Sequence, residues 1–548
     1  MKSKFKNNFF IILFSIIYLI IGFNNFRDYG IGIEEHFQRS SGLFWAEKFF
    51  NFLELENYQI LAEKKYYELI NSTQLPSMNI AYYYGLLFDL PMAIIECVFN
   101  INNSENYFYL RHLSNFCIFF ISGIYFYRIL KKRTQNQLIS FLGTTLYLLA
   151  PKAYGNSFFD GKDLFFLSIL TISFFYYQNY EIKKNYYSLT IFSLFAALAT
   201  SSRIFGLMIP VTFIFLLFLE LINNNNKKVF FNKILFFLFL YFIILFAHWP
   251  YMWTFNVNNL NEFFEPFKVH GIHKVFFDGK FFESNYLPLN YIPKWIIMST
   301  PVYYLFLFFI GYFFYIKRLY LRFENIKSFS INNDLWKGEN EKIDFINFFS
   351  FFQVIFIILS FDLNLIKGWT HFLFLNYFLI YFASLGIYFL YLHFRKRYKM
   401  SIFLLSLFIL FSLELVHKLI IYHPYQSIYF NNLVNKKEDK YEIDYQSLSR
   451  FDAIKFILEN TKKDKITIAT ASWTPLENGA SLIPIKNRKN IIFSGTANKK
   501  ESDFIYTNYF YEVDIRYNKK YEIPDNFSLF KTLYIDDIKV YSIYRKNS

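Results

Sequence analysis

The chain has 548 residues, of which 54% are hydrophobic and 24% are aromatic, and soluble globular proteins are only about 45–50% apolar. Its long apolar runs exceed what a water-soluble core buries, so they predict membrane-spanning helices. The net charge of +15 is carried by short basic loops between these runs, a pattern typical of membrane topology rather than nucleic-acid binding. The two cysteines, Cys97 and Cys117, argue against a disulfide framework or a thiolate metal site.

The first apolar run, residues 9–23, follows a basic N-terminus and is not followed by the small-residue cleavage site of a secretory signal. We predict that it is the first membrane helix and that its basic end is cytoplasmic. The next span is expected at 113–130, so residues 24–110 form a long outer loop. Amphipathic stretches at 42–55 and 57–70 predict two helices in the membrane interface.

Further apolar runs bring the total to about eleven transmembrane helices, and the basic residues fall in every second loop, as the positive-inside rule requires. The outer loops are then 24–110, 151–163 and 248–293, and the N-terminus is cytoplasmic. The remaining spans are predicted at 138–150, 164–179, 187–200, 204–222, 229–247, 294–316, 345–361, 371–394 and 400–421.

The C-terminal part has a different composition, and we expect a transmembrane domain over 1–422 and an extracytoplasmic domain over 423–548. The fold class predicted is an α-helical polytopic membrane protein with a small C-terminal α/β domain. In that domain a helix is predicted over 447–460 and strands over 465–471, 490–493, 531–535 and 539–544.

Acidic residues gather in two of the outer loops. Asp28, Glu34 and Glu35 follow the first helix, and adjacent like charges at a membrane surface indicate acid–base chemistry or a bound cation. A solvated loop start explains them equally well. Asp160 and Asp163 lie in the loop after the third helix, where Asp163 also suits the start of a helix. Two acidic groups on one side of the membrane predict a common site.

Basic residues are predicted on the same side, and Arg203 stands between two apolar runs. An arginine at the edge of a membrane is a functional candidate, and phosphate is its natural ligand there. Arg111, Lys162 and His371 accompany it. The pair His270 and His273 has zinc-like spacing, but two ligands alone are weak support for a metal site, and none is predicted.

An ordered set of motifs runs along the chain. It includes Asp28-Tyr29-Gly30 with Glu34-Glu35, Leu110-Arg111-His112, the segment Ala150–Asp163, the segment Ala199–Gly206, and His248-Trp249-Pro250-Tyr251. The set resembles the GT-C membrane glycosyltransferases, in particular the dolichyl-phosphate-mannose protein mannosyltransferase type in a bacterial form. The family usually has Asp-Glu where this chain has Glu34-Glu35, and Arg-His where it has Thr370-His371.

The resemblance implies an enzyme that moves a sugar from a polyprenyl phosphate to an acceptor hydroxyl on the extracytoplasmic side of the bacterial cytoplasmic membrane, with inversion. No resident cofactor is implied, and a divalent cation stays open. The acceptor is a protein, a lipid or a polysaccharide. The roles implied are general base for Glu34, orientation of that base for Glu35 and Asp28, donor-phosphate binding for Arg203, Arg111, Lys162 and His371, and support of the site for Asp160 and Asp163.

Two other classes of function fit a polytopic chain with charged loops. A lipid or sugar transporter, or flippase, is an alternative, although the sequence has neither an inverted repeat nor paired broken helices. A non-catalytic membrane assembly protein is the other. It predicts that Glu34→Gln leaves activity unchanged, whereas a transferase loses sugar transfer.

Overall fold

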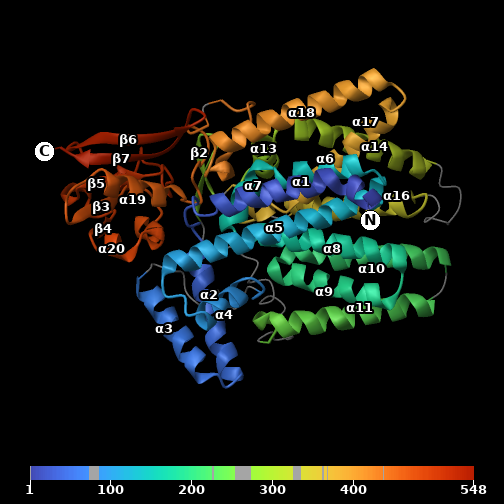
Figure 1. Ribbon diagram of the computed structural model, residues 1–548, viewed down its shortest axis with the longest axis horizontal. Coiled ribbons are helices and arrows are strands. Elements are labelled where there is room, and N and C mark those ends of the chain that lie inside the picture. The colour runs from blue at the N-terminus through green and yellow to red at the C-terminus, as the bar shows by residue number, and fades with distance from the viewer. Residues whose placement is uncertain are drawn as a thin grey trace.

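The computed structural model describes residues 2–72, 85–224, 227–253, 273–324, 335–360, 363–366, 368–435 and 437–547. It consists of a long helical bundle with a small sheet domain at one end (Figure 1). Helices α2, α3 and α4 extend from the bundle near the same end. The predicted fold class is therefore confirmed.

The first half of the chain is helical throughout its described parts. Its elements are α1 (Lys2–Asn25), α2 (Glu35–Phe52), α3 (Glu56–Ser72), α4 (Asp89–Val98), α5 (Ser104–Thr134), α6 (Gln137–Leu148), α7 (Pro151–Phe159), α8 (Asp163–Lys183), α9 (Tyr186–Ser202), η2 (Ile204–Leu207), α10 (Met208–Asn224), α11 (Lys227–His248) and η3 (Pro250–Trp253).

A short hairpin precedes the remaining bundle helices. The elements are β1 (Lys274–Phe277), β2 (Lys280–Glu283), α13 (Tyr291–Ser299), α14 (Val302–Glu324), α16 (Glu339–Ser360), η5 (Thr370–Phe372), α17 (Leu375–Phe394), α18 (Tyr398–Ile421) and η6 (Gln426–Ile428). The single span predicted over 294–316 is wrong in one respect. The chain breaks at Thr300-Pro301 between α13 and α14, because proline cannot donate the backbone hydrogen bond of a continuous helix.

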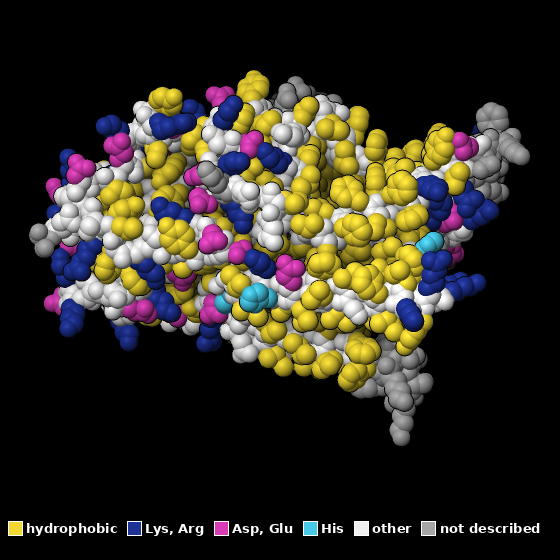
Figure 2. Space-filling model, turned by 90° about the horizontal axis from the view of Figure 1, so that it is seen from above, with side chains coloured by type: hydrophobic (Ala, Val, Ile, Leu, Met, Phe, Trp, Pro, Cys, Tyr) yellow, Lys and Arg dark blue, Asp and Glu magenta, His cyan; other side chains and the backbone are white. Residues whose placement is uncertain are grey.

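Seven helices in the described part of the chain are long and apolar enough to cross a membrane, and this is a multi-pass membrane protein. The apolar part of α1 and helix α6 are shorter, while α8 and α9 coincide with the spans predicted at 164–179 and 187–200. Figure 2 shows a broad band of hydrophobic side chains across one face, with charged side chains gathered at either end. This distribution matches a bundle whose middle lies in lipid. The seven helices are Ser104–Thr134, Ile204–Ile222, Lys227–His248, Val302–Glu324, Glu339–Ser360, Leu375–Phe394 and Tyr398–Ile421.

Two glycines set the spacing between α14 and α17. A Cβ atom at Gly311 would lie 1.9 Å from the carbonyl oxygen of Phe382, and one at Gly386 would lie 2.1 Å from that of Leu307. No side chain fits at these distances, so the two backbones touch directly. Close approach at small residues is a usual way for membrane helices to associate.

The C-terminal domain has a five-stranded sheet in the order β4-β3-β5-β7-β6. Strand β3 pairs in parallel with β4 and β5, whereas β7 pairs antiparallel with β5 and β6. The predicted helix and four predicted strands are present, and β5 was missed because a run of four buried residues shows no alternation. The elements are α19 (Ser449–Glu459), β3 (Ile466–Thr470), η7 (Leu476–Leu482), α20 (Ile485–Arg488), β4 (Ile491–Gly495), η8 (Lys499–Glu501), β5 (Phe504–Thr507), η9 (Lys519–Tyr521), β6 (Phe527–Ile535) and β7 (Ile538–Lys546).

Candidate active site

The predicted acidic loop lies at the end of the bundle that faces the sheet domain. Glu35 begins α2 and is almost completely buried. One carboxylate oxygen, Oε2, accepts the backbone N–H of Gly32 at 2.8 Å and lies 3.2 Å from Nε2 of His112. The other, Oε1, lies 3.5 Å from Nε of Arg111 and has no hydrogen bond among the described residues. The Glu35 carboxylate is thus held from two sides and retains hydrogen-bonding capacity on the third.

Arg111 joins this carboxylate to α4. Its guanidinium donates to Oδ1 of Asp89 at 2.8 Å and to the side-chain oxygen of Gln38, and it stacks on the ring of Phe88 at 4.7 Å. Arg111 is fully buried. Burial raises the pKa of Asp89, the charge of Arg111 opposes this, and the charge of Glu34 adds to it. Arg111 therefore holds an acidic cluster together from inside the protein.

Glu34 stands directly before α2 and is half-buried. Its charge contributes to the raised pKa of Asp89 and also to that of Asp160. These two aspartates belong to different elements, so Glu34 lies within electrostatic reach of both. The structure thus brings the first outer loop near the 151–163 loop, which is far from it in sequence.

Asp160 ends α7 and begins the turn into α8. Its Oδ1 accepts the backbone N–H groups of Lys162 at 3.2 Å and of Asp163 at 2.8 Å. Its Oδ2 is buried and has no hydrogen bond among the described residues. Burial, followed by the charges of Asp163 and Glu34, raises the pKa of Asp160 to about 7. Asp160 therefore presents an unsatisfied acceptor inside the site.

Arg203 and Asp163 form an ion pair between the end of α9 and the start of α8. Their side chains are 15% and 9% exposed, so the pair is largely shielded from solvent. Phe205 contacts Phe372 with ring centroids 5.0 Å apart, which places η5 and its residue His371 beside the segment that carries Arg203. The predicted phosphate-binding residues Arg203 and His371 thus lie on two segments that contact each other.

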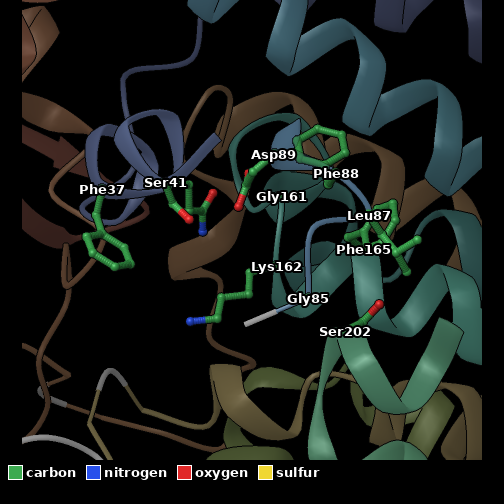
Figure 3. A pocket seen from close by; sticks show the side chains of 11 residues that line it. Phe37, Ser41, Gly85, Leu87, Phe88, Asp89, Gly161, Lys162, Phe165 and Ser202 are labelled. Carbon is green, nitrogen blue, oxygen red and sulfur yellow. The ribbon is translucent and has the colours of Figure 1, made fainter. Parts of the chain in front are cut away.

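A cavity of about 30 Å³, large enough for a water molecule, lies where α2, α4 and the α7–α8 turn meet. Figure 3 shows Ser41 of α2, Asp89 of α4 and Lys162 of the α7–α8 turn around it, with the ammonium of Lys162 extending into the open space. Apolar side chains of Phe88 and Phe165 form part of its wall. The cavity is thus polar where the charged elements meet and apolar toward the bundle.

Asp28 lies apart from the Glu35–Arg111 cluster. Its side chain is 52% exposed, and its Oδ2 lies 2.9 Å from Nε2 of His423, just beyond α18. The neighbouring Tyr29 is buried and donates a hydrogen bond of 2.7 Å to Gln426. Asp28 is therefore placed at the junction with the C-terminal domain rather than in the interior of the site.

The sequence did not indicate how the C-terminal domain holds the acidic loop. Arg450 of α19 is fully buried and donates to the carbonyl oxygens of Ile31 at 2.9 Å, Ser447 at 2.8 Å and Pro475 at 3.0 Å. Ile31 lies three residues before Glu34, so the hydrogen bond from Arg450 connects α19 to the acidic loop. An arginine inside a predicted helix gives no local sign of such a contact, nor does Asp89 within an apolar run.

A metal centre gains no support from the described residues, among which no group of three or more His, Cys, Asp or Glu side chains is arranged to hold a metal ion. The predicted pair His270 and His273 is only partly described, because His270 and the neighbouring Lys268 lie outside the described residues. The ring of His273 contacts that of Trp473 at 6.1 Å. The expectation of a metal-independent or weakly metal-dependent reaction stays a prediction.

Comparison with known proteins identifies part of the chain. Residues 83–261 match the family model of the dolichyl-phosphate-mannose-protein mannosyltransferases. The predicted resemblance is therefore confirmed over a segment that contains Arg111, Asp160, Asp163 and Arg203. No curated protein matches the chain in sequence. The crystal structure of ArnT from Cupriavidus metallidurans bound to undecaprenyl phosphate is similar at 9% identity, with a TM-score of 0.48 and coverage of 98% of each chain.

Proposed function

We propose that this protein transfers a sugar from a polyprenyl phosphate to a hydroxyl group of an acceptor, on the extracytoplasmic side of a bacterial cytoplasmic membrane. The observation that carries the proposal is the convergence of carboxylates and arginines at one end of a membrane bundle. The charge of Glu34 reaches Asp160, which adjoins Asp163 and its ion-pair partner Arg203, and the last three residues lie in the segment that matches a mannosyltransferase family.

Glu34 is proposed as the general base. It is half-buried rather than enclosed, and its charge reaches both Asp89 and Asp160. In the transfer step, the acceptor oxygen forms a bond to the anomeric carbon of the sugar while its proton passes to the Glu34 carboxylate. The bond between the anomeric carbon and the phosphate oxygen breaks, and its electron pair stays on the lipid phosphate.

The leaving phosphate needs cationic groups that face it as its charge grows. We assign this role to Arg203, with Lys162 and His371, because Arg203 pairs with Asp163 at the start of α8, the Lys162 side chain lines the cavity, and η5 carries His371 beside the segment of Arg203. Arg111 was predicted to bind phosphate as well. Its bonds to Asp89 and Gln38 and its contact with Glu35 favour a positioning role instead.

The decisive test compares Glu34→Gln with wild type in membranes supplied with a panel of polyprenyl-phosphate hexoses and pentoses. General-base removal is expected to lower the transfer rate by about 10²–10⁴-fold while the protein level stays normal. Glu56→Gln, the same substitution at an exposed position that begins α3, is the matched control and keeps the wild-type rate. Full activity in Glu34→Gln would falsify the assignment of the base.

The test also separates a transferase from a transporter. A transferase releases free polyprenyl phosphate in proportion to the sugar transferred, since each transfer breaks one bond to phosphate. A flippase moves the intact lipid-linked sugar and releases none. Sugar translocation without release of polyprenyl phosphate in the wild-type protein would replace the proposed function by the alternative.

A further inference from the structure

A second cavity of about 380 Å³ lies between α14 and α18, away from the acidic site. Its volume falls in the range of about 300–1,000 Å³ that is typical of small-molecule sites. It is lined by residues of α14, of α18 and of the segment that follows η6, among them Tyr303, Phe306, Phe411, Glu414, Lys418 and Tyr429. The proposed reaction uses none of these residues.

The apolar wall of this cavity belongs to two helices that qualify as membrane spans. Val302, Phe306 and Phe411 are exposed on the outside of the bundle, where the membrane surrounds it. Side chains of this kind match hydrocarbon chains rather than water. The polar lining, by contrast, lies toward the ends of α14 and α18 that meet the sheet domain. The cavity is therefore amphipathic, as an occupant with a head and a tail requires.

The charged groups of the cavity indicate which kind of headgroup fits it. The Lys418 ammonium donates to both carboxylate oxygens of Asp536, at 2.7 and 2.9 Å, so its charge is balanced by the sheet domain. Glu414 lies one turn earlier on α18, seven residues before the helix ends at Ile421, which is about 10 Å along the axis. A carboxylate on a helix that is apolar enough to span a membrane is costly unless a positive group accompanies it, and the nearby Lys418 already pairs with Asp536.

Two aromatic rings accompany Glu414. Tyr303 and Tyr429 line the same cavity, and the charge of Glu414 follows burial among the causes that raise the pKa of Tyr429. The faces of tyrosine rings attract an ammonium group, and a carboxylate next to them strengthens that attraction. The cavity thus offers the chemistry that recognises an organic cation.

We infer that this cavity binds a phospholipid with an ammonium headgroup, such as phosphatidylethanolamine. Its ammonium lies against Glu414 between Tyr303 and Tyr429, and its phosphate lies toward Asn432 and Lys418, whose three N–H donors exceed the two bonds made to Asp536. An acyl chain follows Phe306 and Phe411 into the membrane. The bound lipid would tie α14 and α18 to the sheet domain through Lys418.

The test measures lipid binding to the purified full-length protein, independently of sugar transfer. Native mass spectrometry and thermal unfolding in detergent are compared with added phosphatidylethanolamine and with added phosphatidylglycerol, which lacks the ammonium. Wild type is expected to retain phosphatidylethanolamine and to gain thermal stability from it. Glu414→Gln is expected to lose at least tenfold in apparent affinity.

The matched control is Glu324→Gln, the same substitution at the other end of α14, which is expected to bind lipid as wild type does. Phosphatidylglycerol bound as tightly as phosphatidylethanolamine would overturn the choice of headgroup. Unchanged phosphatidylethanolamine binding in Glu414→Gln would overturn the site itself. Neither measurement involves a sugar donor, so a failure of the lipid site and a failure of the proposed transferase activity can be told apart.

Discussion

Helix α5 carries a buried arginine near each end, and the carboxylates around these two arginines differ in how completely they are hydrogen-bonded. Arg111 and Arg133 are 22 residues apart on this helix, a separation of about 33 Å. At the Arg133 end, Asp344 accepts four hydrogen bonds: from Arg133 at 2.6 and 2.7 Å, from Arg318 at 2.8 Å and from Tyr381 at 2.7 Å. Both carboxylate oxygens of Asp344 thus accept hydrogen bonds, and its side chain is fully buried.

At the Arg111 end, some of the buried carboxylate oxygens lack a hydrogen bond. Oε1 of Glu35 and Oδ2 of Asp160 are buried without a hydrogen bond among the described residues. A buried acceptor without a partner costs roughly 1–3 kcal/mol, so this arrangement does not maximise stability. The comparison suggests that a saturated charge cluster maintains the bundle, whereas an unsaturated one keeps acceptors ready for a substrate.

Substitution of the saturated carboxylate is expected to have the largest effect on stability. Asp344→Asn leaves the buried Arg133 without its counter-charge and Arg318 with Glu341 alone, and removing one partner of a buried ion pair costs about 3–5 kcal/mol. Asp160→Asn is the matched substitution at the other end and is expected to cost less than about 1 kcal/mol, because Asn retains an oxygen for the two backbone N–H groups. Unfolding in detergent measures both. Equal losses of stability would remove the distinction between the two ends.

The second expected effect concerns the donor phosphate. Arg203→Ala is predicted to lower sugar transfer by about 10²–10³-fold, the loss typical of one donor to a developing negative charge. Arg203→Lys should recover part of the rate, because the charge returns without the planar fork of the guanidinium. Arg516→Ala, at an exposed position in the sheet domain, should leave the rate unchanged. Rates for all three at saturating acceptor decide the matter, and an active Arg203→Ala protein contradicts the assignment.

The third effect is a pH dependence of stability. In the folded protein Asp160 has a pKa of about 7, above its ordinary value of 3.8. Between these values the folded state binds a proton that the unfolded state has released, so the free energy of unfolding falls as the pH rises. The slope from this one group is at most about 1.4 kcal/mol per pH unit. Thermal unfolding of wild type and Asp160→Asn from pH 5 to 8 should show the steeper decline in wild type, and parallel curves would contradict it.

Local patterns in the sequence predicted the helices well. Apolar runs between basic loops are determined by the lipid around them, so they are visible without tertiary contacts. Pro301 nevertheless divided one predicted span, because hydropathy does not register a missing backbone N–H. Strand β5 escaped because its four residues are all buried, which removes the alternation that marks a half-exposed strand.

The candidate site was predicted only in part, because its contacts join distant segments. Glu34, Asp160 and Arg203 were predicted from charges that membrane burial does not explain. Asp89 was not, since a single aspartate in an apolar stretch acquires meaning only when Arg111 reaches it from α5. Arg450 was also missed, and its bond to the carbonyl of Ile31 depends on how the sheet domain docks on the bundle.

The smallest effect is expected at Asp28, and it tests whether burial rather than sequence proximity defines the site. Asp28 lies six positions before Glu34, but it is half-exposed and pairs with His423, and exposed pairs contribute about 0.2–1 kcal/mol. Asp28→Asn is therefore expected to lower sugar transfer less than tenfold, with a loss of stability below about 1 kcal/mol. Transfer rates of Asp28→Asn and Glu34→Gln, measured side by side in the same membranes, give the comparison. A loss in Asp28→Asn as large as that in Glu34→Gln would place Asp28 at the reacting atoms and extend the site to the junction with the sheet domain.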